Sequence, residues 1–154
     1  MTTVDCWQMT QVAQDSLTAQ VEQRLQAENL SAREWIMLRV LSGQSDKKGG
    51  HFRMMSLAPR IGLSASATTR LVRRLENRGL LKRYLCPTDQ RGIYTDLTEE
   101  GFALLARTTP ALEALFAELQ LPDDARGYVE RITALAQDAM PSPCGATCDE
   151  EPRV

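Results

Sequence analysis

Apolar residues recur at spacings of three and four along the first part of the chain, with polar and charged residues between them. They are Met9, Val12, Ala13, Leu17, Val21 and Leu25. This periodicity predicts an amphipathic helix over roughly residues 4–27. Ser31, followed three positions later by Glu34, matches a capping box, which predicts that a second, mostly buried helix begins there and ends near Gly43.

The pattern becomes shorter and less regular in the middle of the chain. Residues 43–50 are rich in glycine and polar residues and predict a loop, and Phe52 to Met55 predicts one short strand. A brief helix is expected to open at Ser56 and to end at Gly62, with Pro59 tolerated in its first turn.

The segment that follows predicts a helix with one apolar and one polar face. Ser64 suits the N-cap, the helix runs to about Arg78, and Gly79 stops it. The side chains expected to be buried are Ala67, Leu71, Val72 and Leu75. A short helix, a tight turn and a second helix together make a helix-turn-helix.

Two strands are expected next, and they form a β-hairpin that we call the wing. Leu80–Cys86 alternates between apolar and polar positions, and Ile93–Leu97 returns along it. The residues between them, 87–92, are rich in turn formers and predict an exposed tip.

Helices with apolar stripes are expected at both ends of the chain. Thr98 caps a long helix that Pro110 should kink or restart, and a last helix begins near Pro122. Because the terminal stripes lie far from the middle module, burying them against a second copy of the chain predicts an isologous homodimer.

The order of the elements predicts a mainly α (α+β) fold: a winged helix-turn-helix with N- and C-terminal dimerisation helices. The expected division is a dimerisation helix at 1–30, a DNA-binding lobe at 31–100, dimerisation helices at 101–140 and a disordered tail at 141–154. A length of 154 residues fits one domain with terminal extensions.

Charge is strongly segregated along the chain. The formal net charge is -2, yet residues 47–94 hold eleven Lys or Arg and two Asp or Glu, a balance of +9. The remainder therefore carries −11. A basic middle between acidic ends indicates a module that binds a polyanion, although a solvated basic face gives the same count.

The helix that begins after Ser64 has the side chains that a DNA major groove requires. Small residues at its leading end, 65–69, let the backbone approach, and Arg70 and Arg73 are long enough to reach base edges. Arg74 and Arg78 are better placed for phosphates. The candidate DNA-binding residues of this segment are Ser64, Ser66, Thr69, Arg70, Arg73 and Arg74.

The expected tip of the wing adds a second candidate contact. Arg91 can enter the narrow, electronegative minor groove, and Asp89 can hold its guanidinium through a charge-assisted hydrogen bond. An isolated Asp-x-Arg turn is usually a surface ion pair. The interpretation as a DNA contact therefore depends on the position of this turn next to a helix-turn-helix.

The stretch MSLAPRIGLSASATTRLVRRLENRGLLKRYLCPTDQRGIYTDLTEEG, roughly residues 55–101, resembles the core of the MarR family of bacterial winged helix-turn-helix regulators. The matching features are Leu57-Ala58, Ile61-Gly62-Leu63-Ser64, Leu71-Val72, Leu75-Glu76, Arg78-Gly79-Leu80, Arg83, Asp89-Gln90-Arg91 and Leu97-Thr98-Glu99-Glu100-Gly101. The resemblance implies an obligate homodimer with interleaved first and last helices, bound to a pseudo-palindromic double-stranded operator, usually to repress. It also implies that Asp89 and Arg91 are the wing pair and that residues 64–74 supply the recognition surface.

The resemblance leaves the releasing signal open. Members of the family are often released by small aromatic acids or phenols held between the dimer helices and the DNA-binding lobe. Trp7 and Trp35 are candidates to line such a pocket, although core packing is the commoner role of such residues. Some relatives instead sense peroxides through a cysteine in the first helix, and Cys6 stands near that position.

Other classes of function have little support in the sequence. His51 is the only histidine and no phosphate loop or nucleophile elbow occurs, so we expect no enzyme, metal site or cofactor. Cys144 and Cys148 form a lone CxxxC, a weak redox or metal signal. A winged-helix module for protein interaction, without DNA binding, remains an alternative. We expect a cytoplasmic protein with reduced thiols and no membrane span or signal peptide.

Overall fold

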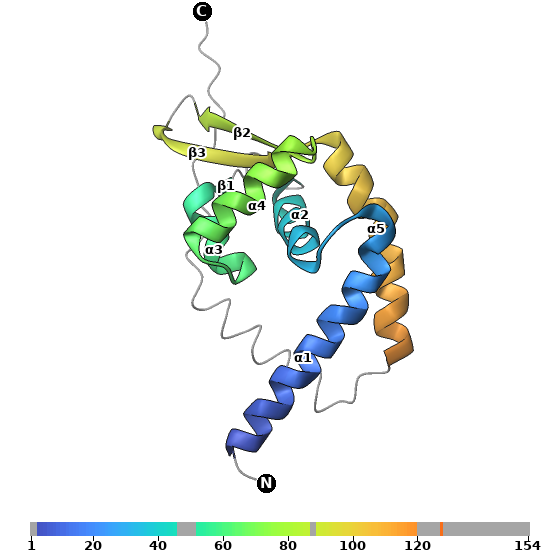
Figure 1. Cartoon of the computed structure of the whole chain (residues 1–154). Coiled ribbons are helices and arrows are strands. Elements are labelled where there is room, and N and C mark those ends of the chain that lie inside the picture. Colours follow the sequence, from blue (N-terminus) through green and yellow to red (C-terminus); the bar gives the residue numbers. More distant parts are fainter. Residues whose placement is uncertain (1–2, 46–51, 87–88, 120–126, 128–154) are drawn as a thin grey trace, which may run out of the picture.

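The computed structural model describes residues 3–45, 52–86, 89–119 and 127 (Figure 1). The elements, in chain order, are α1 (Thr3–Leu25), the 3-10 turn η1 (Gln26–Glu28), α2 (Ala32–Ser45), β1 (Phe52–Arg53), α3 (Met54–Ile61), α4 (Ala65–Asn77), β2 (Leu81–Cys86), β3 (Asp89–Leu97) and α5 (Glu99–Leu119). The predicted order of helices and strands is confirmed over these residues.

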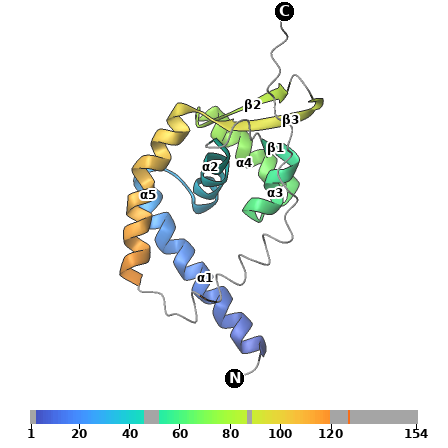
Figure 2. The same cartoon turned by 180° about the vertical axis from the view of Figure 1, so that it is seen from behind.

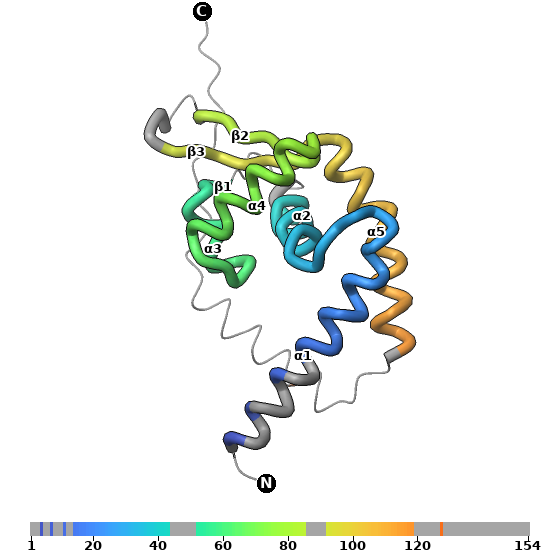
Figure 3. The backbone as a smooth tube through the Cα atoms, viewed as in Figure 1, coloured from blue at the N-terminus to red at the C-terminus, as the bar shows by residue number. Residues whose placement is uncertain are grey.

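The elements form a lobe and a pair of longer helices beside it. In Figures 1 and 2, α2, α3 and α4 pack beneath the small sheet, while α1 and α5 lie together on the side away from α3. An ion pair of 2.7 Å between Arg24 and Glu118 joins the second half of α1 to the end of α5. The tube in Figure 3 shows the second half of α1 beside α5.

The sheet is antiparallel, with the strand order β1-β3-β2. Leu81 pairs with Leu97 and Tyr84 with Tyr94, and the register shifts between Leu85 and Cys86 near the end of the hairpin. The rings of the two tyrosines stack with their centroids 6.2 Å apart. Cross-strand aromatic pairs of this kind fix the register of a hairpin.

One apolar cluster holds the helices and the base of the wing together. Its members with almost no exposed surface include Leu25, Met37, Leu38, Leu41, Leu57, Ile61, Val72, Leu75 and Leu81. They come from α1, α2, α3, α4 and β2, so the lobe and the end of α1 share one core. Trp35 packs against this cluster and donates a 3.0 Å hydrogen bond from its indole N–H to the Thr108 hydroxyl on α5.

Close backbone packing joins α5 to the base of the wing. A Cβ at Gly101 would lie 2.2 Å from the carbonyl oxygen of Leu80 and 2.9 Å from Cδ2 of Leu97, so only glycine fits there. The Thr98 hydroxyl donates to the Gly79 carbonyl at 2.6 Å and accepts from the Gly101 N–H at 3.1 Å, which confirms the expected cap. These contacts set the angle between helix and hairpin.

The structure corrects the expected boundaries around β1. The strand is two residues long and α3 begins at Met54, not at Ser56, so Pro59 lies in the second turn of the helix and not in the first. Arg53 is extended and acts as the N-cap, and the Ser56 hydroxyl donates to its carbonyl at 2.8 Å. Pro59 is exposed, where a missing backbone hydrogen bond is easier to tolerate.

In the second half of the chain, one expectation changes and one of two alternatives is selected. β3 begins at Asp89, so Asp89, Gln90 and Arg91 belong to a strand and not to the tip of the hairpin. Pro110 does not restart α5, which is continuous from Glu99 to Leu119, but the helix changes direction between its two halves, in agreement with the expected kink (Figure 1). The Thr109 hydroxyl donates to the Leu105 carbonyl at 2.7 Å, a contact that is common where helices bend.

Several expectations fall outside the described residues. They are most of the loop at 43–50, the last helix that begins near Pro122, the tail at 141–154 and the cysteines in it. The division of the chain into dimerisation helices and a DNA-binding lobe therefore stays a prediction. Among the helices that the structure does describe, none is long and apolar enough to cross a membrane.

Candidate nucleic-acid interface

Helix α4 is held to the lobe by one apolar face. Leu71, Val72 and Leu75 are buried, as their spacing predicts, and Ala67 is half-buried beside them. Thr68 is buried too, with 1% of its surface exposed, and its hydroxyl donates to the Ser64 carbonyl at 2.9 Å. Thr68 therefore belongs to the packed face and not to the small residues that α4 offers to solvent.

The opposite face of α4 is exposed and basic. Ser66, Thr69, Arg70 and Arg73 all lie on it. Within the part of the chain that the structure describes, Arg70 and Arg73 make no hydrogen bond or ion pair, so both side chains are available to a ligand. The Thr69 hydroxyl donates to the Ala65 carbonyl at 3.0 Å, which leaves its oxygen lone pairs toward solvent.

The leading end of α4 has the predicted cap. The Ser64 hydroxyl oxygen accepts a hydrogen bond from the Ala67 N–H at 3.2 Å and lies 3.3 Å from the Ser66 hydroxyl. Before it, Gly62 has a left-handed backbone with φ 66°, and Arg33 on α2 donates to the Ile61 carbonyl at 2.6 Å. The sequence had not singled out Arg33, whose partner is 28 residues away.

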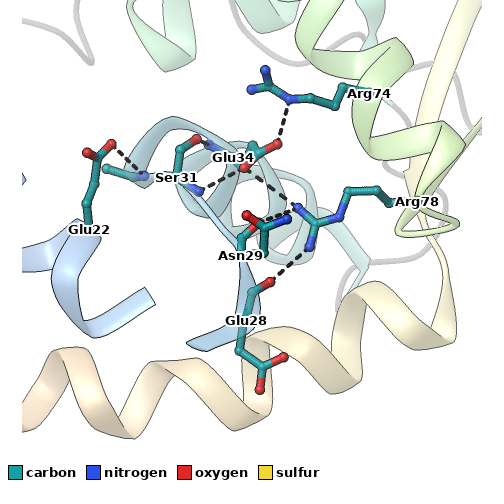
Figure 4. A network of polar contacts seen from close by, with 8 residues as sticks. Glu22, Glu28, Asn29, Ser31, Glu34, Arg74 and Arg78 are labelled. Carbon is teal, nitrogen blue, oxygen red and sulfur yellow. Dashed lines mark hydrogen bonds and ion pairs between the residues drawn. The ribbon is translucent and has the colours of Figure 1, made fainter. Parts of the chain in front are cut away.

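The flank of α4 that faces the α1–α2 corner is also basic, but its arginines are occupied (Figure 4). Arg74 donates from Nε to a carboxylate oxygen of Glu34 at 2.7 Å. Arg78 donates to the carbonyls of Asn29 at 2.8 Å and Glu28 at 3.0 Å, and lies 3.7 Å from Glu34. Arg78 is therefore tied into the protein, and its expected phosphate contact has a competing structural role.

Glu34 connects this flank to the start of α2. Its carboxylate accepts the Ser31 N–H at 2.8 Å, and its own N–H donates to the Ser31 hydroxyl at 3.2 Å, so the predicted capping box is confirmed. Only 4% of the residue is exposed. A buried carboxylate needs charged or polar partners, and here two guanidinium groups supply them. A capping box by itself predicts a glutamate at the helix surface. The ion pairs of Glu34 with Arg74 and Arg78 therefore did not follow from the sequence.

A groove of about 610 Å³ lies where these elements meet. Glu22 and Gln26 line it from the α1 side, and Ser31, Arg74 and Arg78 line it from the opposite side. Neither of the two expected pocket tryptophans lines it. Trp7 is 63% exposed on α1, and Trp35 is packed against the core.

The other flank of α4 is tied to the wing. Arg83 on β2 donates from Nε to the Glu76 carboxylate at 2.9 Å, and a terminal nitrogen of the same guanidinium contacts the same oxygen. These hydrogen bonds lower the pKa of the Glu76 carboxyl below its ordinary value, and they raise the pKa of Arg83. The pair links α4 to the first strand of the hairpin.

Three candidate residues are only partly described. Asp89 and Arg91 have their backbones in β3 and Cys6 has its backbone in α1, but their side chains lie outside the described part of the structure. Their proposed contacts stay predictions. Among the described residues, no group of three or more His, Cys, Asp or Glu side chains is arranged to hold a metal ion.

Comparison with known proteins assigns the lobe to a family. Residues 30–93 match the family model described as "MarR family". This segment is therefore a MarR-family domain. The match includes α2, α3, α4 and most of the wing, and so contains both faces and both flanks of α4. The fold is the winged helix of MarR structures, and solved structures that the chain resembles are MarR-family transcriptional regulators.

Individual proteins are similar to most of the chain. The homoprotocatechuate degradative operon repressor of Escherichia coli is 28% identical over 110 residues, which cover 71% of this chain and 70% of the relative. The structure of Sco3205 from Streptomyces coelicolor in complex with DNA is 25% identical, with a TM-score of 0.70, and 92% of each chain is covered. CouR from Rhodococcus jostii RHA1, bound to p-coumaroyl-CoA, is 25% identical with a TM-score of 0.69, covering 83% of this chain and 89% of CouR.

Proposed function

We propose that the protein is a homodimeric repressor that binds a pseudo-palindromic operator and leaves it when a small molecule binds. The exposed basic face of α4 carries this proposal, because its arginines make no hydrogen bond or ion pair with the described residues while the opposite face is packed in the core. In this function α4 is the recognition helix, lying in the major groove. Such a regulator works in the cytoplasm.

The roles we propose within the interface follow from position. Arg70 and Arg73 face outward, one turn behind the small leading residues, and are assigned to base edges. Ser64, Ser66 and Thr69 are assigned to the backbone at the leading end, where free N–H groups of the first helical turn favour a phosphate. Arg91, steadied by Asp89, is assigned to the minor groove.

Exposed apolar side chains on the terminal helices support the homodimer. Val4 and Trp7 on α1 are 69% and 63% exposed, and Phe116 on α5 is 42% exposed. Large apolar side chains exposed on both terminal helices are typical of surfaces that a partner covers. A second copy that covers them places two recognition helices about one DNA turn, ~34 Å, apart.

For the releasing signal we favour a small aromatic or phenolic acid bound in the groove at the α1–α2 corner. Arg74 and Arg78 reach this groove from α4, so an acid bound there touches the recognition helix directly. The name of the operon repressor from Escherichia coli, which refers to degradation of an aromatic acid, agrees with this class. Oxidation of Cys6 is the alternative signal.

The DNA-binding proposal is tested with wild type and Arg91→Ala on the DNA around the protein's own gene. We expect wild type to bind one sequence preferentially, with an affinity that falls steeply as salt rises. Absence of such binding would contradict the proposal of a DNA-binding regulator and would favour the alternative, a winged-helix module for protein interaction. Equal binding by Arg91→Ala would exclude the proposed wing contact but not the function.

The releasing signal is tested by a thermal-shift screen of phenolic acids, metals and oxidants, followed by DNA-release assays. An acid that uses the groove should release wild type, and Gln26→Trp, which fills the groove, should resist it. Release by mild hydroperoxide that disappears in Cys6→Ser would favour the redox alternative instead.

A further inference from the structure

The contact between Glu34 and Arg74 uses only the inner edge of the guanidinium. Arg74 reaches Glu34 through Nε at 2.7 Å, while its side chain as a whole is 61% exposed and that of Glu34 is 6% exposed. Figure 4 shows the two terminal nitrogens of Arg74 pointing away from the carboxylate. The buried partner therefore fixes the group from behind and leaves its outer edge open.

The outer edge of a guanidinium held in this way suits a phosphate. Its terminal N–H groups form a planar fork that matches two phosphate oxygens, and an oriented fork loses less conformational freedom on binding. Glu34, Arg74 and Arg78 together carry a net charge of +1, so the buried carboxylate does not cancel the attraction for an anion.

We propose that Glu34 is a positioning residue for DNA binding, which aims the outer edge of Arg74 at a backbone phosphate beside the major groove. This inference rests on the proposed DNA-binding function. It assigns to a buried capping residue of α2 a role in the affinity of α4, and it gives Arg74 two simultaneous partners, Glu34 through Nε and DNA through the terminal nitrogens.

The remaining contacts of Glu34 make it a rigid support. Ser31 holds the carboxylate through its N–H at 2.8 Å, and α2 is fixed in the core by Leu38 and Leu41. Arg78, which is itself tied to two backbone carbonyls, borders the other side of the carboxylate. Glu34 therefore has little freedom to follow Arg74, and the guanidinium must adopt the direction that the carboxylate sets.

The proposal predicts a sign opposite to that of simple electrostatics. Removing a negative charge near DNA should strengthen binding if charge alone matters. We expect Glu34→Gln instead to weaken operator binding about fivefold, because one amide oxygen replaces two charged acceptors and holds Arg74 less firmly. Arg74→Ala should weaken binding about tenfold and reduce the slope of log K against log salt by about 0.9.

Coupling between the two residues is the decisive measurement. In an Arg74→Ala background, Glu34→Gln should change the affinity by less than about twofold, because its effect acts through Arg74. Arg74→Lys keeps the charge but lacks Nε, so it should bind nearly as weakly as Arg74→Ala. Additive effects, or wild-type affinity and salt slope in Arg74→Lys, would overturn the proposal.

The chain offers two matched controls. Glu22→Gln removes the same charge from the same groove, where Glu22 accepts a hydrogen bond from the Ala32 N–H and does not contact Arg74. Ser31→Ala weakens the cap of α2 but keeps the ion pair. Neither variant should reduce operator affinity more than about twofold, and a loss equal to that of Glu34→Gln in either would assign the effect to charge or to capping.

All titrations are made well below the unfolding midpoint of the least stable variant. If Glu34→Gln does not fold, the comparison of Arg74→Lys with wild type decides the proposal. Failure of wild type to bind any DNA refutes the proposed function itself. Wild-type binding with an unchanged or tighter Glu34→Gln refutes only the role of Glu34.

Discussion

The two arginine pairs of α4 differ in what the protein does with them. Arg70 and Arg73 face solvent and make no hydrogen bond or ion pair with the described residues. Arg74 and Arg78, only a few positions further on, contact Glu34 and the backbone of the α1–α2 corner. Each residue turns the helix by about 100°, so neighbours in sequence meet different surroundings.

This difference separates side chains of α4 that can contact DNA bases from side chains that hold α4 in the lobe. A side chain without internal partners can adapt to base edges, whereas one with several internal contacts must keep a fixed direction. Arg74 belongs to both groups, because its Nε is engaged and its outer edge is exposed. Stability and DNA binding should therefore respond differently to substitutions on the outward face and on the flank.

The largest effect on stability is expected from Arg78→Ala. The substitution removes hydrogen bonds to two carbonyls and one of the two cations beside buried Glu34, which should lower the free energy of unfolding by about 2–3 kcal/mol. Denaturant unfolding measures it. Arg70→Ala on the outward face is the control and should change stability by less than about 0.5 kcal/mol. Equal losses of unfolding free energy in both variants would show that the outward and the flank arginines do not differ in their contribution to stability.

Arg73→Ala should affect recognition without affecting stability. Loss of a bidentate contact to a guanine removes about 1–3 kcal/mol of discrimination at one base pair, while the unfolding midpoint stays unchanged. Binding to a panel of operators with single base-pair changes measures the discrimination. A variant that kept the full base preference of wild type would show that Arg73 does not read a base.

Arg33→Ala tests whether the turn of the helix-turn-helix also depends on α2. Its hydrogen bond of 2.6 Å to the Ile61 carbonyl supports the end of α3, and losing it should cost about 1 kcal/mol. Thermal unfolding gives the value. Arg39→Ala, an exposed arginine on the same helix that makes no side-chain hydrogen bond to the described residues, should be neutral.

The smallest effect concerns the ion pair between Glu76 and Arg83 on the other flank of α4. Hydrogen bonds from Arg83 lower the pKa of Glu76 in the folded protein, so the stabilisation is complete above the ordinary carboxyl value of 4.5 and is lost as the pH falls through the lowered folded pKa. The contribution is below about 1 kcal/mol, because the side chains are 30% exposed.

Urea unfolding between neutral and acidic pH measures this contribution. We expect wild type to be more stable than Arg83→Gln at pH 7 and the difference to shrink as Glu76 takes up a proton. A difference that stays constant down to acidic pH would show that Arg83 acts through packing and not through charge.

Local patterns predicted the elements whose signals lie within a few residues. The spacing of Leu71, Val72 and Leu75 predicts the buried face of α4 from the sequence of that helix alone. The cap at Ser64 and the capping box of Ser31 with Glu34 likewise join residues only three positions apart. The boundary between β1 and α3 was wrong, because the pairing of Phe52 with Thr95 on β3 and the extended Arg53 set it. That information is not local.

The candidate site was predicted in part for the same reason. Exposed Arg70 and Arg73 follow from helix periodicity, but the engagement of Arg74 and Arg78 depends on residues 40 to 50 positions away. Thr68 looked like one of the small leading residues, although its position on the helix turns it into the core. The groove at the α1–α2 corner arises only when those elements meet α4.

The capping box of α2 also makes one backbone proton a reporter of the recognition helix. The Ser31 N–H is bound by the same carboxylate that holds Arg74. Exchange of this proton with deuterated solvent requires its hydrogen bond to the Glu34 carboxylate to break, which is easier once the arginines of α4 have moved away. Slow hydrogen exchange at the Ser31 N–H therefore indicates that α4 contacts the α1–α2 corner. A ligand that separates α4 from this corner should accelerate the exchange.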